Sequence, residues 1–587
     1  MIMINTDNVF ETALKLLNAF LIGVCCIFLL SACSSEKYKR TGDESKSISA
    51  EVSISGGLIR GLISDKKTNS LKQYHGIPFA APPLGKLRWA PPAPVIPWAG
   101  TLDATSHGRY CMQPETTGIG IYIGTRSNPS EDCLTINVWT RANKVDEKRP
   151  VMVWIHGGGL LGGAGFEQSG EALTKKGVVL VTFNYRLGRL GFFSHPELSA
   201  ESPKGVSGNQ GFRDQIAALH WVKENITKFG GDPNNVTIFG ESAGSFSVSA
   251  LQASPLAKGL FHRAIGQSGG IFWPMSHRSI DRPWAPSDEK LGMMLAEALV
   301  GEALVGEGGN ASLDLLRAMP ADQVIAAAES SPALSALEYI PTVDGEVLPD
   351  EISFIFARGE QADVPTMIGN NANEHEAVMD LFTCINGSGI DGFNRFKMGL
   401  LGEVFDEIGS LYPSDSEQTI LQSWEEFSND VNFTYPMRLW ARAMSNVSSD
   451  VYLYWFNYYP PVADRQYKAF HGGDLPYVFG QLDMFGGNPV GTDFVDADTM
   501  MSIWTRFAAS GNPNGKNIDG WEAFTPSNES YFILGSENAP ARNLRTERMG
   551  LIEKAWDIRR VQGTASLPTV MPTGIKDLMR KCKGANS

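Results

Sequence analysis

The feature that most constrains the fold of this chain is a short apolar run that leads directly into a tight turn around a serine. Residues 236–239 form the run, and Gly240, Glu241, Ser242, Ala243 and Gly244 follow in the order Gly-x-Ser-x-Gly. The run predicts a buried strand, and the small residues after the serine predict the start of a helix. A serine at such a corner has an exposed hydroxyl beside free helical N–H groups. We therefore predict Ser242 as a nucleophile.

Further apolar runs extend this pattern along the chain. Residues 151–155, 178–183 and 364–368 are continuous apolar stretches, which are typical of parallel strands covered on both faces. Residues 214–229 carry Ile216, Leu219, Val222 and Ile226 at helical spacing. Alternating strands and helices predict an α/β fold: a large, mostly parallel central sheet with helices on both faces. Segments 274–341 and 381–449 are the expected insertions, which would form a lid and the walls of a gorge.

A run of glycines follows one of the predicted strands. Residues 151–155 lead into His156, Gly157, Gly158 and Gly159. Such glycines let the backbone pass close to a substrate and turn its N–H groups inward. Gly158 and Gly159, with Ala243 after the serine, are thus candidates for an oxyanion hole, and His156 for orienting that backbone. The plain alternative is a flexible glycine-rich turn.

A general base is needed beside the serine, and nine histidines are available. His471 lies in a turn-rich segment after the strand-like run 451–456, where a loop histidine is well placed to reach Ser242. The alternative is an ordinary surface or core histidine. His375 is a weaker candidate, because it adjoins the candidate acid and neighbouring side chains diverge.

The acid that would orient the histidine is Glu374, at the tip of the polar loop after residues 364–368. Glu376 and Asp380 are nearby rivals. The chain order serine, acid, histidine is the order found in α/β-hydrolases.

Longer motifs resemble the type B carboxylesterase and cholinesterase family of α/β-hydrolases. The resemblance covers residues 52 to 521. Its blocks occur in the family's order at residues 74–89, 131–139, 184–188, 208–211, 214–215, 229–244, 341–346 and 504–514.

The resemblance implies a serine carboxylesterase that forms an acyl-enzyme and needs no cofactor. Ser242 would be the nucleophile, His471 the base and Glu374 the acid. The resemblance also implies an oxyanion hole of Gly158, Gly159 and Ala243, an Arg88–Glu131 ion pair, a Ser268 hydroxyl near the acid, and a Glu241 that tunes the site. For Glu241 a buried, hydrogen-bonded carboxyl is an equal alternative.

Other functions stay open at this point. A lipase, amidase or thioesterase would use the same residues, and a non-catalytic surface-binding relative shares the fold. The chain departs from the family at His375, where glycine is usual, and at Leu160 and Leu161, where an aromatic residue is common. No tryptophan lies between Cys111 and Cys133, so choline esters, which need a cation–π contact, are not the expected substrate.

The first part of the chain predicts export. Residues 16–30 are apolar and end in Leu-Ser-Ala-Cys33, which resembles the lipobox of bacterial lipoproteins. We expect a signal peptide over 1–32, lipidation of Cys33, a flexible tether over 33–50, a hydrolase domain over 51–575 and a tail over 576–587. The protein would then be anchored in the cell envelope, at a bacterial outer membrane. An ordinary signal peptide is the alternative.

Cysteines and charge complete the sequence-based predictions. Cys111 and Cys133 match the family's first disulfide, and an oxidising compartment permits it. Cys384 and Cys582 either pair or stay as thiols. No Cys/His spacing suggests a metal site, and the net charge of −14 argues against a nucleic-acid partner. A small-molecule ester is the expected partner, and the sequence gives no basis for an oligomeric state.

Overall fold

The computed structural model describes residues 46–64, 70–114, 116–117, 124–282, 286–300, 313–330, 341–375, 389–401, 405–462, 467–516 and 518–562. The chain divides into two compact units, Met1–Ser47 and Ile48–Ser587. Strand β1 (Lys46–Ile48) crosses their boundary, and all described residues other than Lys46 and Ser47 belong to the second unit. Among the described residues, no helix has the length and apolar character needed to span a bilayer.

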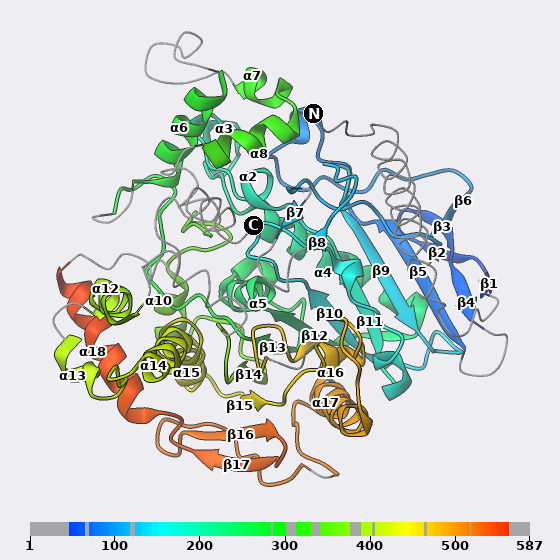
Figure 1. Cartoon of the computed structure of the whole chain (residues 1–587). Coiled ribbons are helices and arrows are strands. Elements are labelled where there is room, and N and C mark those ends of the chain that lie inside the picture. The colour runs from blue at the N-terminus through cyan, green and yellow to red at the C-terminus, as the bar shows by residue number, and fades with distance from the viewer. Residues whose placement is uncertain are drawn as a thin grey trace, which may run out of the picture. The chain divides into compact units, whose positions relative to one another are not determined.

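A large sheet forms the centre of the second unit (Figure 1). Its strands run in the order β4-β5-β9-β11-β10-β12-β13-β14-β15-β16-β17. The pairs from β11 to β16 are parallel, and the outer pairs are antiparallel. The strands are β4 (Leu62–Ser64), β5 (Leu71–Pro78), β9 (Thr135–Thr140), β10 (Arg149–Ile155), β11 (Val179–Phe183), β12 (Gly231–Glu241), β13 (Arg263–Gln267), β14 (Thr366–Asn371), β15 (Val451–Asn457), β16 (Ser530–Gly535) and β17 (Ala539–Arg542). The predicted α/β fold with a mostly parallel sheet is confirmed.

Two smaller sheets lie outside the main one. The first has the order β2-β3-β6 and the second pairs β7 with β8. Their strands are β2 (Val52–Ile54), β3 (Gly57–Arg60), β6 (Thr101–Asp103), β7 (Thr116–Thr117) and β8 (Gly124–Thr125).

Both faces of the main sheet are buried. Alternate residues of a strand point to opposite faces, so the two faces can be told apart by the apolar cluster that each residue joins. In β10, Val151 and Val153 belong to one apolar cluster, whereas Met152 and Trp154 belong to another. Helices α4 (Gln210–Asn225), α5 (Ala243–Ala253), α10 (Ile352–Ala357) and α15 (Tyr435–Met444) contribute to the first cluster, and α16 (Leu475–Phe479) and α17 (Gly491–Ser510) to the second. The continuous apolar strands are thus explained by helices on both faces.

The predicted elements differ from the observed ones mainly at their ends. Strand β14 begins at Thr366 rather than at residue 364, because Pro365 has no N–H to give to the ladder. Helix α4 begins at Gln210 rather than at residue 214, and it ends at Asn225, where a 3₁₀ turn (η5, Ile226–Phe229) takes over before Gly230.

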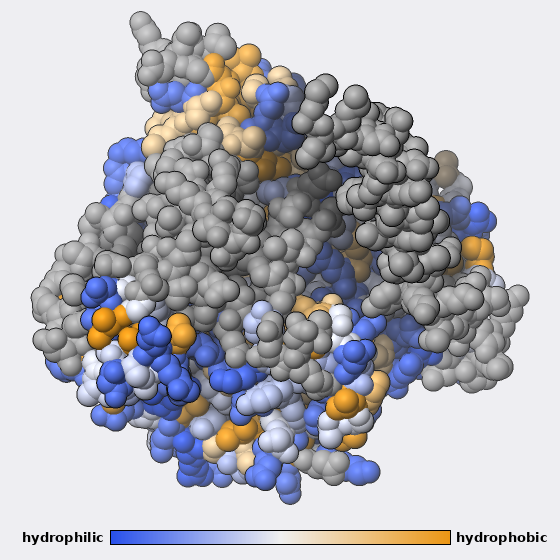
Figure 2. Space-filling view, viewed as in Figure 1, coloured by the Kyte–Doolittle hydropathy of each residue, from blue (hydrophilic) through white to orange (hydrophobic). Residues whose placement is uncertain are grey.

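The segments predicted as insertions contain two additional helical layers. One comprises α6 (Asp288–Val300), α7 (Leu313–Ala318) and α8 (Ala321–Ser330), which pack with α2 (Gly188–Gly191) and α3 (Pro196–Glu201) around a small apolar cluster. The other comprises α12 (Gly389–Leu401), α13 (Phe405–Gly409) and α14 (Glu417–Asn429), which pack with α18 (Thr546–Gln562) from outside these segments. Figure 2 shows apolar residues on the surface of the first layer, where Met294 and Leu315 are 42% and 44% exposed. That these layers form a lid and gorge walls stays a prediction.

Candidate active site

Ser242 occupies the corner between β12 and α5, as predicted. Its backbone has φ 56° and ψ −123°, a conformation that residues other than glycine rarely adopt. The Ser242 N–H donates to the carbonyl of Gln267 on β13 at 2.8 Å, which ties the corner to the neighbouring strand. The side chain is partly exposed. The strained turn therefore presents the hydroxyl to solvent.

The glycines around this corner permit close backbone contacts. A Cβ on Gly244 would overlap the carbonyl oxygen of Ile155 at the end of β10, and a Cβ on Gly240 would overlap the backbone of Gly244. Any side chain at either position would push α5 away from the sheet. The Gly-x-Ser-x-Gly spacing is thus explained by contact of the turn with β10.

The glycine run after β10 lies beside the serine. A Cβ on Gly157 would be 3.2 Å from Ser242 Cβ, and Gly158 and Gly159 have φ of 101° and 66°. Within the described part of the chain, the N–H groups of Gly158, Gly159 and Ala243 form no hydrogen bond. These three N–H groups have no other described partner, and that they form an oxyanion hole stays a prediction.

His156 supports this glycine run rather than the chemistry. Its ring stacks on Tyr185 at 4.4 Å, and its Nδ1 lies 2.9 Å from the carbonyl oxygen of Gly157. The Tyr185 hydroxyl donates to the His156 carbonyl at 2.8 Å. Burial lowers the pKa of His156 to about 4, so the ring is neutral at neutral pH.

His471 and Glu374 form the hydrogen bond that the predicted triad needs. His471 Nδ1 lies 2.7 Å from Glu374 Oε2, and the carboxylate is completely buried. The other oxygen, Oε1, accepts the N–H of Asn371 at 2.7 Å. The His471 N–H also donates to the Glu374 carbonyl at 3.1 Å. The acid thereby fixes the imidazole with Nε2 directed away from it.

Nε2 of His471 faces the residue next to the serine. It lies 3.2 Å from Glu241 Oε1, at ion-pair distance but without hydrogen-bond geometry. Among the described residues, no hydrogen bond joins Ser242 Oγ to His471. The structure thus brings Glu374 and His471 into contact and places Ser242 one residue from the second partner of the imidazole. Catalytic hydrogen bonds are often absent before substrate binds.

The buried carboxylates set the charge of this site. Burial raises the pKa of Glu241 well above its ordinary value. Burial alone would lower the pKa of His471, but the carboxylates of Glu241 and Glu374 raise it above that of free histidine. Glu241 therefore interacts electrostatically with the base, and its Oε1 has no hydrogen bond among the described residues. That it tunes the site stays a prediction.

Sequence reasoning missed a third buried acid that acts on the histidine. Asp474 is completely buried, and its Oδ2 accepts the Gln267 amide at 2.5 Å. Trp504 Nε1 in turn donates to Gln267 Oε1 at 3.0 Å. Burial raises the pKa of Asp474 to about 6. Its position three residues after His471, in a turn, was the available signal.

Phe433 was also missed, and it separates two histidines. Its ring centroid lies 5.0 Å from that of His471 and 5.1 Å from that of His375. Burial lowers the pKa of His375 to about 3, which makes it a poor general base near neutral pH. Glu376 and Asp380, the rival acids, lie outside the described residues.

The remaining predicted residues have different outcomes. Arg88 and Glu131 form a two-point ion pair at 2.7 and 2.5 Å, and Cys111 and Cys133 form a disulfide. Ser268 has a buried hydroxyl, and no hydrogen bond joins it to Glu374 in the described structure. Cys33, Cys384 and Cys582 lie outside the described residues. The described residues contain no group of three His, Cys, Asp or Glu side chains suited to a metal ion.

Comparisons with known proteins show which proteins this chain resembles. A model of the "Carboxylesterase family" matches residues 48–552. The chain is 35% identical to a fumonisin B1 esterase from Sphingopyxis macrogoltabida over 82% of this chain and 85% of that one. It is 34% identical to a para-nitrobenzyl esterase from Bacillus subtilis (strain 168), over 81% and 94%. A solved PNB esterase structure superposes with a TM-score of 0.71 at 31% identity, covering 86% of this chain and 99% of the other.

Proposed function

The chain belongs to the carboxylesterase family and is a carboxylic ester hydrolase, and we propose that Ser242, His471 and Glu374 carry out its reaction. The observation that supports this most strongly is the 2.7 Å hydrogen bond between His471 and the fully buried Glu374. A carboxylate at Nδ1 fixes the tautomer in which Nε2 is free to take a proton. Ser242 lies on the strained turn next to Glu241, whose Oε1 is 3.2 Å from His471 Nε2.

The first half of the proposed reaction forms an acyl-enzyme. His471 Nε2 accepts the proton of Ser242 as Oγ attacks the ester carbonyl carbon. The carbonyl oxygen becomes negative and is stabilised by the N–H groups of Gly158, Gly159 and Ala243. The tetrahedral intermediate then collapses, the C–O bond to the alcohol breaks, and the protonated His471 gives its proton to the leaving alkoxide.

The second half releases the acid. His471 takes a proton from water, which attacks the acyl carbon, and the same three N–H groups hold the oxyanion again. Collapse breaks the bond to Ser242 Oγ, which recovers its proton from His471. Glu374 stays ionised and stabilises the imidazolium in both halves.

We propose small carboxylic esters with an aromatic or benzylic alcohol as test substrates. The support comes from the relatives, one of which is named for para-nitrobenzyl esters. Choline esters are not proposed, since no tryptophan lies between Cys111 and Cys133.

Hydrolysis of short p-nitrophenyl esters tests the assignment of the nucleophile. Ser242→Ala should lose about 10⁴-fold or more in kcat, because the covalent route is removed. The matched control is Ser245→Ala, one turn along α5, whose buried hydroxyl donates to the Gly269 carbonyl. The control should keep kcat within a few-fold of wild type. Near-wild-type activity of Ser242→Ala would remove Ser242 from the mechanism.

We also propose that Cys33 carries a lipid that anchors the protein to a bacterial outer membrane. The support is the apolar stretch 16–30 followed by Leu-Ser-Ala-Cys, since two or more acyl chains give firm attachment. Metabolic labelling with an alkyne fatty acid should tag the wild type and not Cys33→Ser. Equal tagging of both proteins would reject this site.

A further inference from the structure

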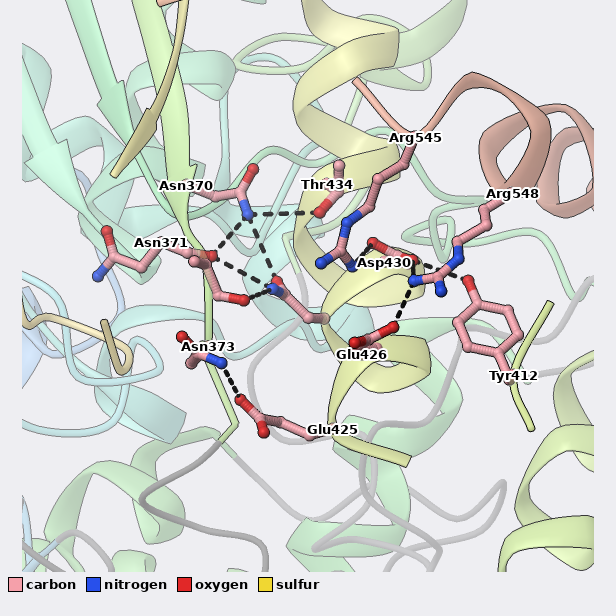
Figure 3. Close-up of polar contacts among 12 residues, drawn as sticks. Asn370, Asn371, Asn373, Tyr412, Glu425, Glu426, Asp430, Thr434, Arg545 and Arg548 are labelled. Carbon is pink, nitrogen blue, oxygen red and sulfur yellow. Dashed lines mark hydrogen bonds and ion pairs between the residues drawn. The ribbon is translucent and has the colours of Figure 1, made fainter. Parts of the chain in front are cut away.

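The loop that carries Glu374 is bound by side chains from a distant helix. Asn429, at the end of α14, donates its amide to the carbonyl of Ala372 at 2.6 Å and of Asn371 at 3.3 Å. Glu425, one turn earlier, accepts the amide of Asn373 at 2.6 Å. Figure 3 shows these contacts between the loop and the helix. Three consecutive residues before the acid are therefore held by α14.

One residue, Asn371, links this contact to the acid itself. The N–H of Asn371 donates to Glu374 Oε1, and its carbonyl oxygen accepts from Asn429. The Asn371 side chain donates to the carbonyl of Phe470, the residue before His471, at 2.6 Å. Asn371, Glu374 and Asn429 are completely buried. A shift of Asn429 would thus move the donor that orients the Glu374 carboxylate.

The helix has an unusual geometry at this point. Directly after Asn429, residues Asp430–Thr434 form a single π-helical turn (η10), which continues into α15. Such turns insert one extra residue into a helix and occur often at functional sites. Here Asn429 bonds to the acid loop, whereas Asp430 faces Arg548 of α18 (Figure 3). The ring of Phe433 lies 5.0 Å from that of His471.

Asp430 anchors the turn on its other side. The carboxylate is completely buried and accepts the Tyr412 hydroxyl at 2.8 Å and the Arg545 guanidinium at 2.7 Å. Arg548 lies 3.5 Å away. Burial raises the pKa of Asp430, while the two arginines favour its charged form. The helix end that carries Asn429 is thereby fixed to the C-terminal helix α18 (Figure 3).

We propose that Asn429 is a positioning residue, which holds the 371–373 backbone so that Glu374 and His471 keep their hydrogen bond. The proposal depends on the catalytic role given to Glu374 above. The competing explanation is that Asn429 only stabilises the fold. The two differ in their effect on the base, because a displaced Glu374 changes the pKa of His471 and a merely less stable protein does not.

The test compares Asn429→Ala with Ser428→Ala, a neighbour whose buried hydroxyl has no hydrogen bond in the described structure. Asn429→Ala should lower kcat for a p-nitrophenyl ester roughly 10- to 100-fold, with KM changed less than about three-fold, since small displacements of catalytic groups cost rates of this order. Ser428→Ala should behave as wild type.

The pH profile of kcat/KM gives the second readout. His471 faces Glu241, Glu374 and Asp474, with His375 beyond Phe433. Loosening Glu374 removes one of the groups that raise the pKa of His471, so the acid limb should move to lower pH. Asn429→Ser, which keeps a donor, should recover part of kcat and of the shift.

Asn429→Leu keeps the volume of the side chain and removes the hydrogen-bond donor. It replaces Asn429→Ala in the test if the alanine variant is insoluble. A folded alanine or leucine variant with wild-type kcat and an unshifted acid limb would overturn the proposal. Loss of folding in both would also overturn it, because the residue would then act on stability. Glu374→Gln separates the two proposals. If it loses activity while Asn429→Ala does not, only the positioning role fails; if Glu374→Gln keeps activity, the proposed triad fails.

Discussion

The two sides of this active site are held in place in different ways. The serine corner is fixed by backbone contacts between neighbouring segments: Gly240 and Gly244 let β12 and α5 touch β10. The acid loop is fixed by side-chain hydrogen bonds from residues more than fifty positions away, of which Asn429 to Ala372 is the clearest. The serine corner depends on the absence of side chains at two glycines. The acid loop depends on particular side-chain hydrogen-bond donors.

The difference shows why one side can be identified from a short motif and the other cannot. A corner that needs glycine at two positions can be recognised from a motif of five residues. A loop that needs an amide from α14 leaves no local mark, since Asn429 has the same appearance in sequence as any helix-end asparagine. The acid side should therefore tolerate changes of the loop sequence only when its distant partners are kept.

Glu374→Gln gives the largest expected effect on the acid side. The amide can still occupy the buried site but cannot stabilise the imidazolium, so kcat should fall about 10³- to 10⁴-fold. Steady-state hydrolysis of a p-nitrophenyl ester measures it. Glu407→Gln, which alters a surface ion pair with Lys554, is the control and should change kcat less than two-fold. A fall of less than ten-fold for Glu374→Gln would mean that the acid side is not catalytic.

Gly244→Ala tests the serine side. The new methyl group would overlap the Ile155 carbonyl, and relief of the overlap should cost about 3 kcal/mol or more of unfolding free energy. Gly550→Ala in α18 is the matched control, because a Cβ there meets no atom within 4 Å. It should be neutral or stabilising by up to about 1 kcal/mol. Thermal or urea unfolding distinguishes the two, and equal stability would contradict the close-contact explanation.

Asp430→Asn tests how far the acid side extends. The change leaves Arg545 and Arg548 without their buried carboxylate, and because both arginines are 23% exposed, we expect a loss of about 2 kcal/mol in unfolding free energy. Asp498→Asn, which removes a surface pair with Lys176, should cost less than about 0.5 kcal/mol. Denaturant titration measures the unfolding free energy of both variants. Equal losses would show that Asp430 does not anchor the acid side to α18.

Glu241→Gln has the smallest expected effect and concerns the point where the two sides meet. Only neutral His471 can act as base, so kcat/KM rises as pH passes through its pKa. Glu241 helps to raise that pKa. Removing its carboxylate should therefore move the midpoint of the acid limb about one pH unit lower. Glu522→Gln, in a surface pair with Arg542, should leave the limb in place. An unshifted limb in Glu241→Gln would show that its carboxyl is not charged during catalysis.

Much of the fold was predictable because it depends on local patterns. The apolar runs became β10, β11, β12 and β14, and their ends differed, at β14 because of Pro365. The serine corner and its glycines follow from one motif. The serine, acid and histidine candidates followed from loops after predicted strands, taken in the α/β-hydrolase order. The Cys111–Cys133 disulfide and the Arg88–Glu131 ion pair came from resemblance to the family.

The rest was not predictable because it joins residues that are distant in sequence. Gln267 meets Asp474 across 207 positions and Arg545 meets Asp430 across 115. No periodicity records such pairs. The contact of Glu241 with His471 was foreseen only as a general influence, and its distance depends on how the loop after β15 returns to the corner.

Locating a fluorophosphonate adduct by mass spectrometry tests the central claim most directly, since such probes react with an activated serine. The account predicts one adduct, on the peptide that contains Ser242. Labelling should disappear in Ser242→Ala and slow at least 100-fold in His471→Ala. An adduct on another residue, or labelling of Ser242→Ala at the wild-type rate, would contradict it.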